Sequence, residues 1–354
     1  MNHTTAKSTL SSNLQQNQIK PLPVGTLVHN QYKIVHVLSK GSFSWVYLAQ
    51  DLRSLKKNNK TIVVIKEYAP DGFSERNNPN NQTHWIKPLT SHSVEFQAGL
   101  EIFFSEIHAL CSLRSNYIAN VLDAFTWSDN AYFVMEYCEG ITLEQKITQS
   151  IKQKSHFNQP IISLFTLLRF ARSLTEVLRQ IHTTGWLHLD IKPANLYIRR
   201  DGNAMLLDLG SARHELKQRA PHKGITYTPR FAPPELRDHQ TLNTSNIGPW
   251  SDVYSFAACL YQMICGQAPP LKGVDAPSFE QQLTHNLELL HADQSITKRL
   301  QTLITESMLQ NPMQRTASFF TIERQIADID ELLLKTQLTS NPVSATKNNL
   351  ISFF

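Results

Sequence analysis

The spacing of apolar residues changes along this chain, from the period of β-strands to the period of α-helices. Short runs rich in β-branched and aromatic residues predict an antiparallel meander of strands. These runs cover 32–38, 45–49, 61–66, 119–125 and 131–136. Apolar residues three and four apart predict a helix over 96–110 and longer helices over 164–181 and 253–264. The order predicts an α+β chain, with a five-stranded antiparallel sheet plus one helix followed by a mainly helical part.

Three regions are expected along the chain. Residues 1–24 are rich in Ser, Thr, Asn and Gln and hold almost no aromatic residues, which predicts a disordered arm. At 354 residues the chain exceeds the size at which a single core stops growing, so two lobes are expected. We expect one domain over 25–335, with lobes at 25–137 and 138–335, and a tail over 336–354.

Composition excludes several classes of function. The 34 Lys and Arg against 29 Asp and Glu give a net charge of +5, and these charges are scattered, which argues against nucleic-acid binding. The four cysteines form no C-x-x-C pair, so reduced core thiols are expected. No run of eighteen apolar residues and no apolar stretch at the N-terminus occurs, which predicts a cytoplasmic chain without a membrane span.

Polar residues able to carry chemistry concentrate in two short segments, His188–Asn195 and Asp208–Gly210. They flank a hairpin that is expected to turn at Asp201-Gly202. Transfer of a phosphoryl group from ATP needs a carboxylate that orients the acceptor, oxygen ligands for magnesium and a cation near the phosphates. The two segments offer these parts. Asp190 can accept a proton, Asn195 and Asp208 are oxygen ligands, and Lys192 can neutralise charge on the γ-phosphate.

At this point the sequence strongly resembles the protein kinase family. The pattern H-x-D-x-K-x-x-N, the D-x-G triplet and the upstream Val63-Val-Ile-Lys66 follow one another in the order of that family's motifs. The resemblance covers about residues 24–335 and implies a two-lobed protein kinase fold. It implies that Asp190 is the catalytic base, that Asn195 and Asp208 hold magnesium, and that Lys66 contacts the α- and β-phosphates with Glu106 as its helix partner.

The same resemblance implies a substrate class and further contacts. The Asp190-x-Lys192 form is similar to serine/threonine kinases, and the segments 65–70 and 228–235 resemble the bacterial eukaryotic-like members. Glu235 is expected to pair with Arg315, and Asp252 to support the catalytic loop. The implied reaction transfers the γ-phosphate of ATP to Ser or Thr hydroxyls of protein substrates, with Mg²⁺ as cofactor and Mn²⁺ as an alternative. The residues implied to bind ATP beside Lys66 are Leu38, Gly41, Val46, Val64, Met135, Glu136, Cys138 and Tyr197.

Two departures from the family pattern leave alternatives open. The phosphate-covering loop, Ser39–Val46, keeps only the middle glycine, Gly41, of the usual three. This favours weaker ATP binding and motivates a second hypothesis, a pseudokinase scaffold that binds nucleotide weakly. A third hypothesis is a small-molecule phosphotransferase of similar fold. Leu189 stands where an arginine usually meets an activation-loop phosphate, so loop phosphorylation is not expected to be required.

Overall fold

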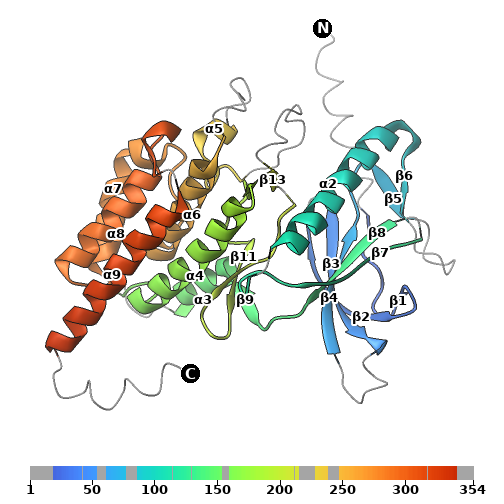
Figure 1. The fold of residues 1–354 in the computed structure, drawn as a ribbon, viewed down its shortest axis with the longest axis horizontal. Helices are drawn as coiled ribbons and strands as arrows, with labels where there is room; N and C mark the ends of the chain where they lie inside the picture. Colours follow the sequence, from blue (N-terminus) through green and yellow to red (C-terminus); the bar gives the residue numbers. More distant parts are fainter. Residues whose placement is uncertain are drawn as a thin grey trace, which may run out of the picture. The chain divides into compact units, whose positions relative to one another are not determined.

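The computed structural model describes residues 19–41, 43–53, 61–76, 86–113, 115–128, 130–153, 159–210, 212–214, 228–237, 247–316 and 318–340. Most of the expected N-terminal arm and of the C-terminal tail lies outside these residues. The chain divides into two compact units, each described separately below (Figure 1). Unit 1 comprises Met1–Ser112 and Ala119–Cys138, and unit 2 comprises Leu113–Ile118 and Glu139–Phe354.

Unit 1 is built on an antiparallel sheet with the strand order β1-β2-β3-β4-β8-β7. Its strands are β1 (Leu27–Val28), β2 (Tyr32–Lys40), β3 (Ser44–Asp51), β4 (Thr61–Tyr68), β7 (Val121–Trp127) and β8 (Asn130–Glu136). All five strands expected from the sequence are present. The expected count was wrong by one, because the sheet has six strands. The additional strand, β1, pairs with β2 through two residues only, which is too short for an alternating pattern.

One helix covers one face of this sheet, as expected. α2 (Ser93–Ser112) follows the short helix η2 (Thr90–His92) and packs against β7 and β8. It buries Phe103, whose ring centroid lies 5.2 Å from that of Phe133 on β8. Between β4 and η2 the chain forms a small hairpin of β5 (Ser74–Arg76) and β6 (Ile86–Pro88).

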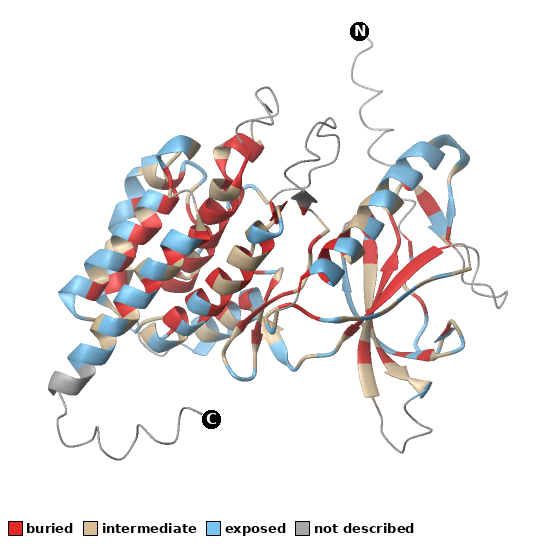
Figure 2. Ribbon diagram, in the orientation of Figure 1, coloured by how far each residue is buried: buried red, intermediate tan, exposed pale blue. Residues whose placement is uncertain are grey.

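The other face of the sheet carries the main core of unit 1 (Figure 2). Its buried members are Leu22, Val28, Tyr32, Ile34, Tyr47, Ala49, Val63, Ile65, Tyr132 and Val134. Leu22 and Ile19 belong to the range expected to be an arm, yet they are 0% and 3% exposed. Two apolar side chains of this range are therefore buried in unit 1 before the first strand begins.

Unit 2 is mainly helical. Its helices are α3 (Leu143–Gln153), α4 (Leu164–Thr183), α5 (Pro234–Arg237), α6 (Pro249–Cys265), η5 (Gly273–Asp275), α7 (Pro277–Glu288), α8 (Gln294–Ser307), η6 (Pro312–Gln314) and α9 (Phe319–Ser340). The two apolar stripes of the sequence lie on α4 and α6, as expected. Fourteen of the seventeen residues of α6 are buried, so this helix forms the centre of the unit. No helix in the described part of the chain is both long and apolar enough to cross a membrane.

Short strands of unit 2 position its polar loops. They are β9 (Gly140–Thr142), β10 (Trp186–Leu187), β11 (Leu196–Arg199), β12 (Ala204–Leu206) and β13 (Arg213–His214). β11 and β12 form the hairpin predicted from the sequence, and Gly202 turns it at a φ of +83°. β9 adds to the other side of β11. There a Cβ on Gly140 would lie 2.2 Å from the carbonyl oxygen of Ile198, so only glycine allows this pairing.

Candidate active site

The side chains of Lys66 and Glu106 form a buried ion pair inside unit 1. Lys66 projects from β4 and Glu106 from α2, with 2.6 Å between Nζ and Oε1. Their side chains are only 7% and 3% exposed. A buried charge is costly unless it is paired, so each of these residues requires the other. The structure thus brings together two residues that the sequence separates by forty positions.

Residues expected to bind nucleotide cluster on the sheet face that carries Lys66. The strand registers place Val46 opposite Lys66 and Met135 opposite Val64. Directly opposed residues share a face, and residues two apart on a strand do as well, so all four lie on one face. Glu136 ends β8, and its carboxylate accepts a hydrogen bond of 3.1 Å from the side-chain amide of Asn120.

Leu38, Gly41 and Cys138 lie nearer the ends of the unit 1 strands. Leu38 lies near the end of β2 and is 44% exposed, and Gly41 follows that strand directly. The N–H of Gly41 donates to the carbonyl of Ser44 over 2.8 Å, which closes the turn between β2 and β3. A Cβ on Gly41 would lie 2.8 Å from the Ser44 hydroxyl, so a larger residue here would displace that side chain. Cys138 forms no disulfide with another described cysteine and is half-buried.

In unit 2, Asp190 lies in the loop between β10 and β11. Two side chains of this loop bind one oxygen of its carboxylate. The Oδ2 atom accepts hydrogen bonds from Lys192 Nζ at 2.7 Å and from Asn195 Nδ2 at 3.0 Å. Asn195 Nδ2 also donates to the backbone oxygen of Asp190 over 2.9 Å. The second carboxylate oxygen, Oδ1, is buried and has no hydrogen-bond partner among the described residues. One oxygen of Asp190 is therefore fixed, and the other can accept a proton.

The surroundings of Asp190 shift its pKa upward. Burial is the largest cause, because it disfavours the charged carboxylate. The hydrogen bond and positive charge of Lys192 act in the opposite direction, and the nearby carboxylate of Asp208 adds to the rise. A raised pKa makes Asp190 a better proton acceptor than an exposed aspartate, provided that it is ionised at the working pH.

Asp208 follows β12 and is tied to the same loop. Its Oδ1 accepts a hydrogen bond of 2.8 Å from the N–H of Gly210, and the N–H of Leu207 donates to the carbonyl of Asn195 over 3.1 Å. Because Asn195 directs its amide nitrogen at Asp190, its amide oxygen remains as a ligand atom. Among the described residues, no three His, Cys, Asp or Glu side chains are arranged so that they could hold a metal ion by themselves. One carboxylate and one amide oxygen fit Mg²⁺, which takes few protein ligands together with phosphates and water.

Asp252 of α6 supports the loop that carries Asp190, as expected. It is fully buried and accepts hydrogen bonds of 2.8 Å from the backbone N–H groups of His188 and Leu189. Burial alone would raise its pKa, but the hydrogen bond and charge of His182 lower the pKa of Asp252 below its usual value. His182, 2.8 Å from Asp252, was not singled out from the sequence. The sequence did offer one signal for His182, which is its position beside the apolar stripe of α4.

Leu189 occupies a backbone conformation that side chains rarely adopt, with a φ of +63°. Its side chain is 2% exposed and joins an apolar cluster. The other members of this cluster are Leu187, Ala232, Leu236 and Ile247. At the position where the family pattern has arginine, the chain therefore packs hydrocarbon against the segment that leads into α5.

α5 itself is fixed by a buried ion pair, as predicted. Arg315 donates to both carboxylate oxygens of Glu235, at 2.7 and 3.0 Å. The hydroxyl of Ser251 on α6 adds a third hydrogen bond to Glu235, of 2.8 Å. The guanidinium of Arg315 also lies 5.0 Å from the ring of Tyr254. These contacts anchor α5 to the centre of unit 2.

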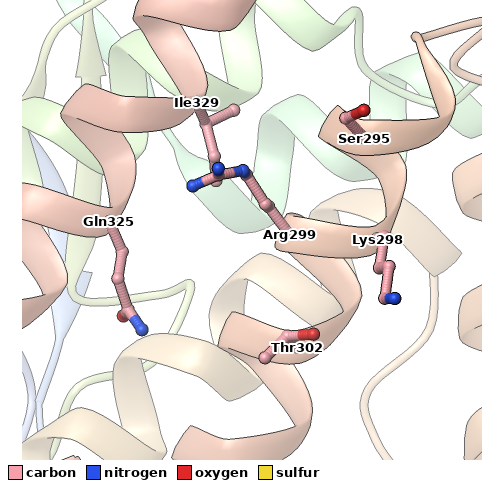
Figure 3. Close-up of a pocket in the computed structure, with 6 residues that line it drawn as sticks. All are labelled: Ser295, Lys298, Arg299, Thr302, Gln325 and Ile329. Carbon is pink, nitrogen blue, oxygen red and sulfur yellow. The ribbon is translucent and has the colours of Figure 1, made fainter.

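Tyr197, also expected to contact the nucleotide, lies on β11. Its hydroxyl donates a hydrogen bond of 2.6 Å to the carbonyl oxygen of Gly140 on β9. The two strands therefore hold each other through a side chain as well as through their backbones. A pocket of about 350 Å³ lies elsewhere in unit 2, on α8 and α9 (Figure 3). It is lined by Ser295, Lys298, Arg299, Thr302, Gln325 and Ile329, none of which belongs to the candidate site.

Comparison with known proteins gives one consistent answer. The model of a family described as the protein kinase domain matches residues 32–326. A probable serine/threonine-protein kinase of Clostridium perfringens is 24% identical over 331 residues, which cover 91% of this chain and 41% of that protein. The serine/threonine-protein kinase PknA of Nostoc sp. is 25% identical over 315 residues, covering 86% of this chain and 48% of PknA.

Solved structures agree with these sequence matches. The apo form of PpkA-294 matches with a TM-score of 0.67 at 25% identity, and the match covers 87% of this chain and 99% of that one. The chain spans less than half the length of the two curated relatives above.

Proposed function

This chain belongs to the protein kinase domain family, and we propose that it transfers the γ-phosphate of ATP to serine or threonine hydroxyls of protein substrates. The match over residues 32–326 establishes the family, and the likeness to PpkA-294 confirms the expected fold. The serine/threonine specificity is supported by the names of the two relatives. We place the reaction in the cytoplasm, where ATP is supplied.

The geometry around Asp190 carries this proposal. A general base must hold one oxygen where it can receive the proton of the attacking hydroxyl. Lys192 and Asn195 fix Oδ2, while Oδ1 stays buried without a partner among the described residues. Asp190 therefore orients the acceptor hydroxyl through Oδ1 and takes its proton. Its raised pKa suits this task.

The remaining charges assist at the phosphates. We assign Lys192 a second contact, to the γ-phosphate, because its ammonium group already lies 2.7 Å from Asp190. Lys66, fixed by Glu106, contributes a cation for the α- and β-phosphates. Asn195 and Asp208 would hold Mg²⁺, or Mn²⁺ in its place. When bound, the metal neutralises charge on the phosphates of ATP.

The nucleotide itself is proposed to contact unit 1 through apolar side chains. Val46, Val64 and Met135 lie on the sheet face of Lys66, where an adenine ring can be enclosed by hydrocarbon. Leu38, Gly41, Glu136 and Cys138 at the strand ends complete the contacts proposed for unit 1. Tyr197 is the contact proposed for unit 2.

Substitution of the base tests the proposed function. Asp190→Asn keeps the size of the side chain but cannot accept a proton, so transfer from labelled ATP to myelin basic protein should fall by about 10²–10⁴-fold. Affinity for ATP should change little, since Asp190 is not assigned to ATP. Asp201→Asn is the matched control, because asparagine also suits the exposed β11–β12 turn. Full activity in the Asp190 variant would contradict the proposal.

A further inference from the structure

A charged side chain interrupts the apolar face of the unit 1 sheet. Glu67 follows Lys66 on β4, and successive side chains of a strand point to opposite faces. Glu67 therefore shares the face of Val63 and Ile65, which belong to the core, while Lys66 points to the face of α2. Glu67 is 0% exposed. A buried carboxylate at this position requires partners that compensate for its lost hydration.

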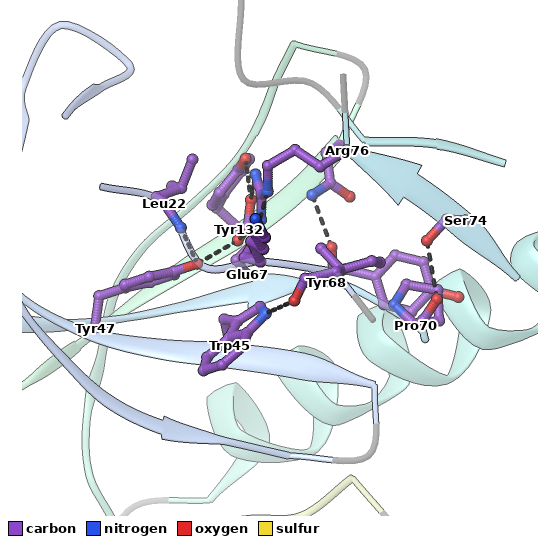
Figure 4. A network of polar contacts seen from close by, with 12 residues as sticks. Leu22, Trp45, Tyr47, Glu67, Tyr68, Pro70, Ser74, Arg76 and Tyr132 are labelled. Carbon is purple, nitrogen blue, oxygen red and sulfur yellow. Dashed lines mark hydrogen bonds and ion pairs between the residues drawn. The ribbon is translucent and has the colours of Figure 1, made fainter. Parts of the chain in front are cut away.

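Four hydrogen bonds from three separate elements meet on the Glu67 carboxylate (Figure 4). The hydroxyl of Tyr47 on β3 donates over 2.6 Å, and the hydroxyl of Tyr132 on β8 donates over 2.8 Å. Arg76 of β5 donates to both oxygens, at 3.0 and 2.7 Å. Its side chain is only 7% exposed. We call these four residues the Glu67 network.

Charge and burial keep the hydrogen-bond donors around Glu67 protonated. Burial, followed by the negative charge of Glu67, raises the pKa of Tyr47 and of Tyr132 well above its usual value. Both phenols therefore remain protonated donors at physiological pH. The guanidinium of Arg76 stays charged as well, so the carboxylate keeps all four of its hydrogen bonds.

The Glu67 network also fastens the chain ahead of the first strand. The N–H of Leu22 donates to the Tyr47 hydroxyl over 3.0 Å, and Arg76 Nε donates to the carbonyl of Lys20 over 2.8 Å. Beside it, the indole N–H of Trp45 donates to the carbonyl of Ile19 over 2.9 Å. The N–H of Ile19 donates to Asp71 Oδ1 over 2.9 Å. Residues 19–22 thus lie across the sheet face opposite Lys66, held in part by side chains of the network.

The position of Glu67 links this network to Lys66. β3 and β8 are the two strands that flank β4, and their registers place Trp45 and Tyr132 opposite Glu67. A slip of β4 by one residue would exchange its faces and leave Glu67 and Arg76 unpaired. Buried ion pairs stabilise a fold little but are well suited to select one register. The register that this pair selects is the one in which Lys66 meets Glu106.

We propose that Glu67 is a positioning residue, which fixes the register of β4 and so holds Lys66 where it meets the phosphates of ATP. This inference rests on the proposed function of Lys66. Residues 19–22 and the β5–β6 hairpin, which supplies Arg76, take part in positioning although neither carries a residue of the candidate site.

A single substitution separates positioning from stability. Glu67→Gln keeps the shape of the side chain but removes its charge and turns one acceptor into a donor. A misplaced Lys66 should raise the KM for ATP about tenfold and leave the KM for myelin basic protein unchanged. A purely structural role would lower the fraction of active enzyme, and therefore kcat, with the KM for ATP unaltered. Hydrogen exchange at the Leu22 amide should also become at least about tenfold faster, since its acceptor Tyr47 loses its anchor.

Control variants make every result decisive. Glu75→Gln is the same change one strand residue before Arg76, at an exposed position, and should leave both KM values at their wild-type level. If Glu67→Gln does not fold, Tyr132→Phe, which removes one hydrogen bond, should raise the KM for ATP about two- to threefold. A wild-type KM for ATP in the folded variant overturns the proposal. If the wild-type protein transfers no phosphate, the proposed function fails. The affinity for ATP, measured by calorimetry, then tests the role of Glu67: weaker binding in Glu67→Gln supports positioning, and equal binding refutes it.

Discussion

Two opposing effects act on the pKa of Asp190. Burial raises its pKa, and Lys192, 2.7 Å away, lowers it. The proposed base works only as a carboxylate, so activity is expected to be lost as the pH falls through the pKa of Asp190. The ammonium group of Lys192 therefore extends the active range toward acid.

Removal of that ammonium group should move the acid limb of the pH profile. In Lys192→Met the pKa of Asp190 rises further, so the limb of kcat/KM shifts to higher pH, in addition to a lower maximum rate. Lys192→Arg keeps the positive charge and should leave the limb close to that of the wild type. Measurement of kcat/KM from acid to neutral pH in the three proteins checks this. A limb that stays in place in the methionine variant would show that Asp190 does not sense Lys192.

The residues of the candidate site differ in how far the sequence revealed them. Asp190, Asn195 and Asp208 stand close together in the sequence, in a spacing that their shared chemistry explains. Glu67 was overlooked, because two of its partners, Tyr47 and Tyr132, are 20 and 65 positions away. One local signal existed: an acidic residue two positions after Ile65 falls on the apolar face of a strand and must be paired there.

At the scale of elements, the segment Pro234–Arg237 is held by buried contacts on two sides. Apolar packing on Leu189 fixes one side, and the Glu235–Arg315 ion pair fixes the other. Both contacts are buried, so neither depends on a modification of the chain. The order of this segment is therefore expected to be built into the fold.

Two changes test this apolar anchor. Treatment of the purified protein with a phosphatase should leave activity within about twofold of its starting value, because no phosphate-binding arginine precedes Asp190. Leu189→Arg should lower the free energy of unfolding by about 3 kcal/mol or more, since it places an unpaired charge in a site that is 2% exposed. Leu189→Met keeps the volume and should cost less than about 1.5 kcal/mol. Urea unfolding measures both variants, and an arginine variant as stable as the methionine variant would contradict the packing argument.

Elements with a clear signal in the sequence were predictable whatever their length. The β11–β12 hairpin is short and was expected from its Asp201-Gly202 turn, whereas α7, α8 and α9 are long and were not expected individually. β2, β3, β4, β7 and β8 and the helices α2, α4 and α6 carry enough apolar residues to display a period. β1 and β9 hold two and three residues, which no period can reveal. Pairing with another strand determines whether such short strands form. β9 pairs with Tyr197 and Ile198 of β11, which lie over fifty residues later in the chain.

For the whole molecule, ATP should act as a stabilising ligand. A ligand that binds only the folded state adds about 2.7 kcal/mol to the free energy of unfolding at one hundred times its Kd. Thermal unfolding with ATP and Mg²⁺ should therefore give a higher Tm than Mg²⁺ alone, and EDTA should remove most of the gain. Asp208→Asn should lose the part that depends on Mg²⁺. An unchanged Tm with ATP would contradict nucleotide binding, and a higher Tm without phosphate transfer would favour the pseudokinase hypothesis.

Residues 113–118 belong to unit 2, although they are encoded between two stretches of unit 1. The carbonyl of Tyr117 accepts from the N–H of Leu206, and the carbonyl of Asn116 accepts from Arg199, 83 residues later. During synthesis at roughly 5–20 residues per second, the partners of these carbonyls are translated about 4–18 s later. The first unit to be translated therefore carries an unfinished loop, and no single cut in the chain can separate the two units cleanly.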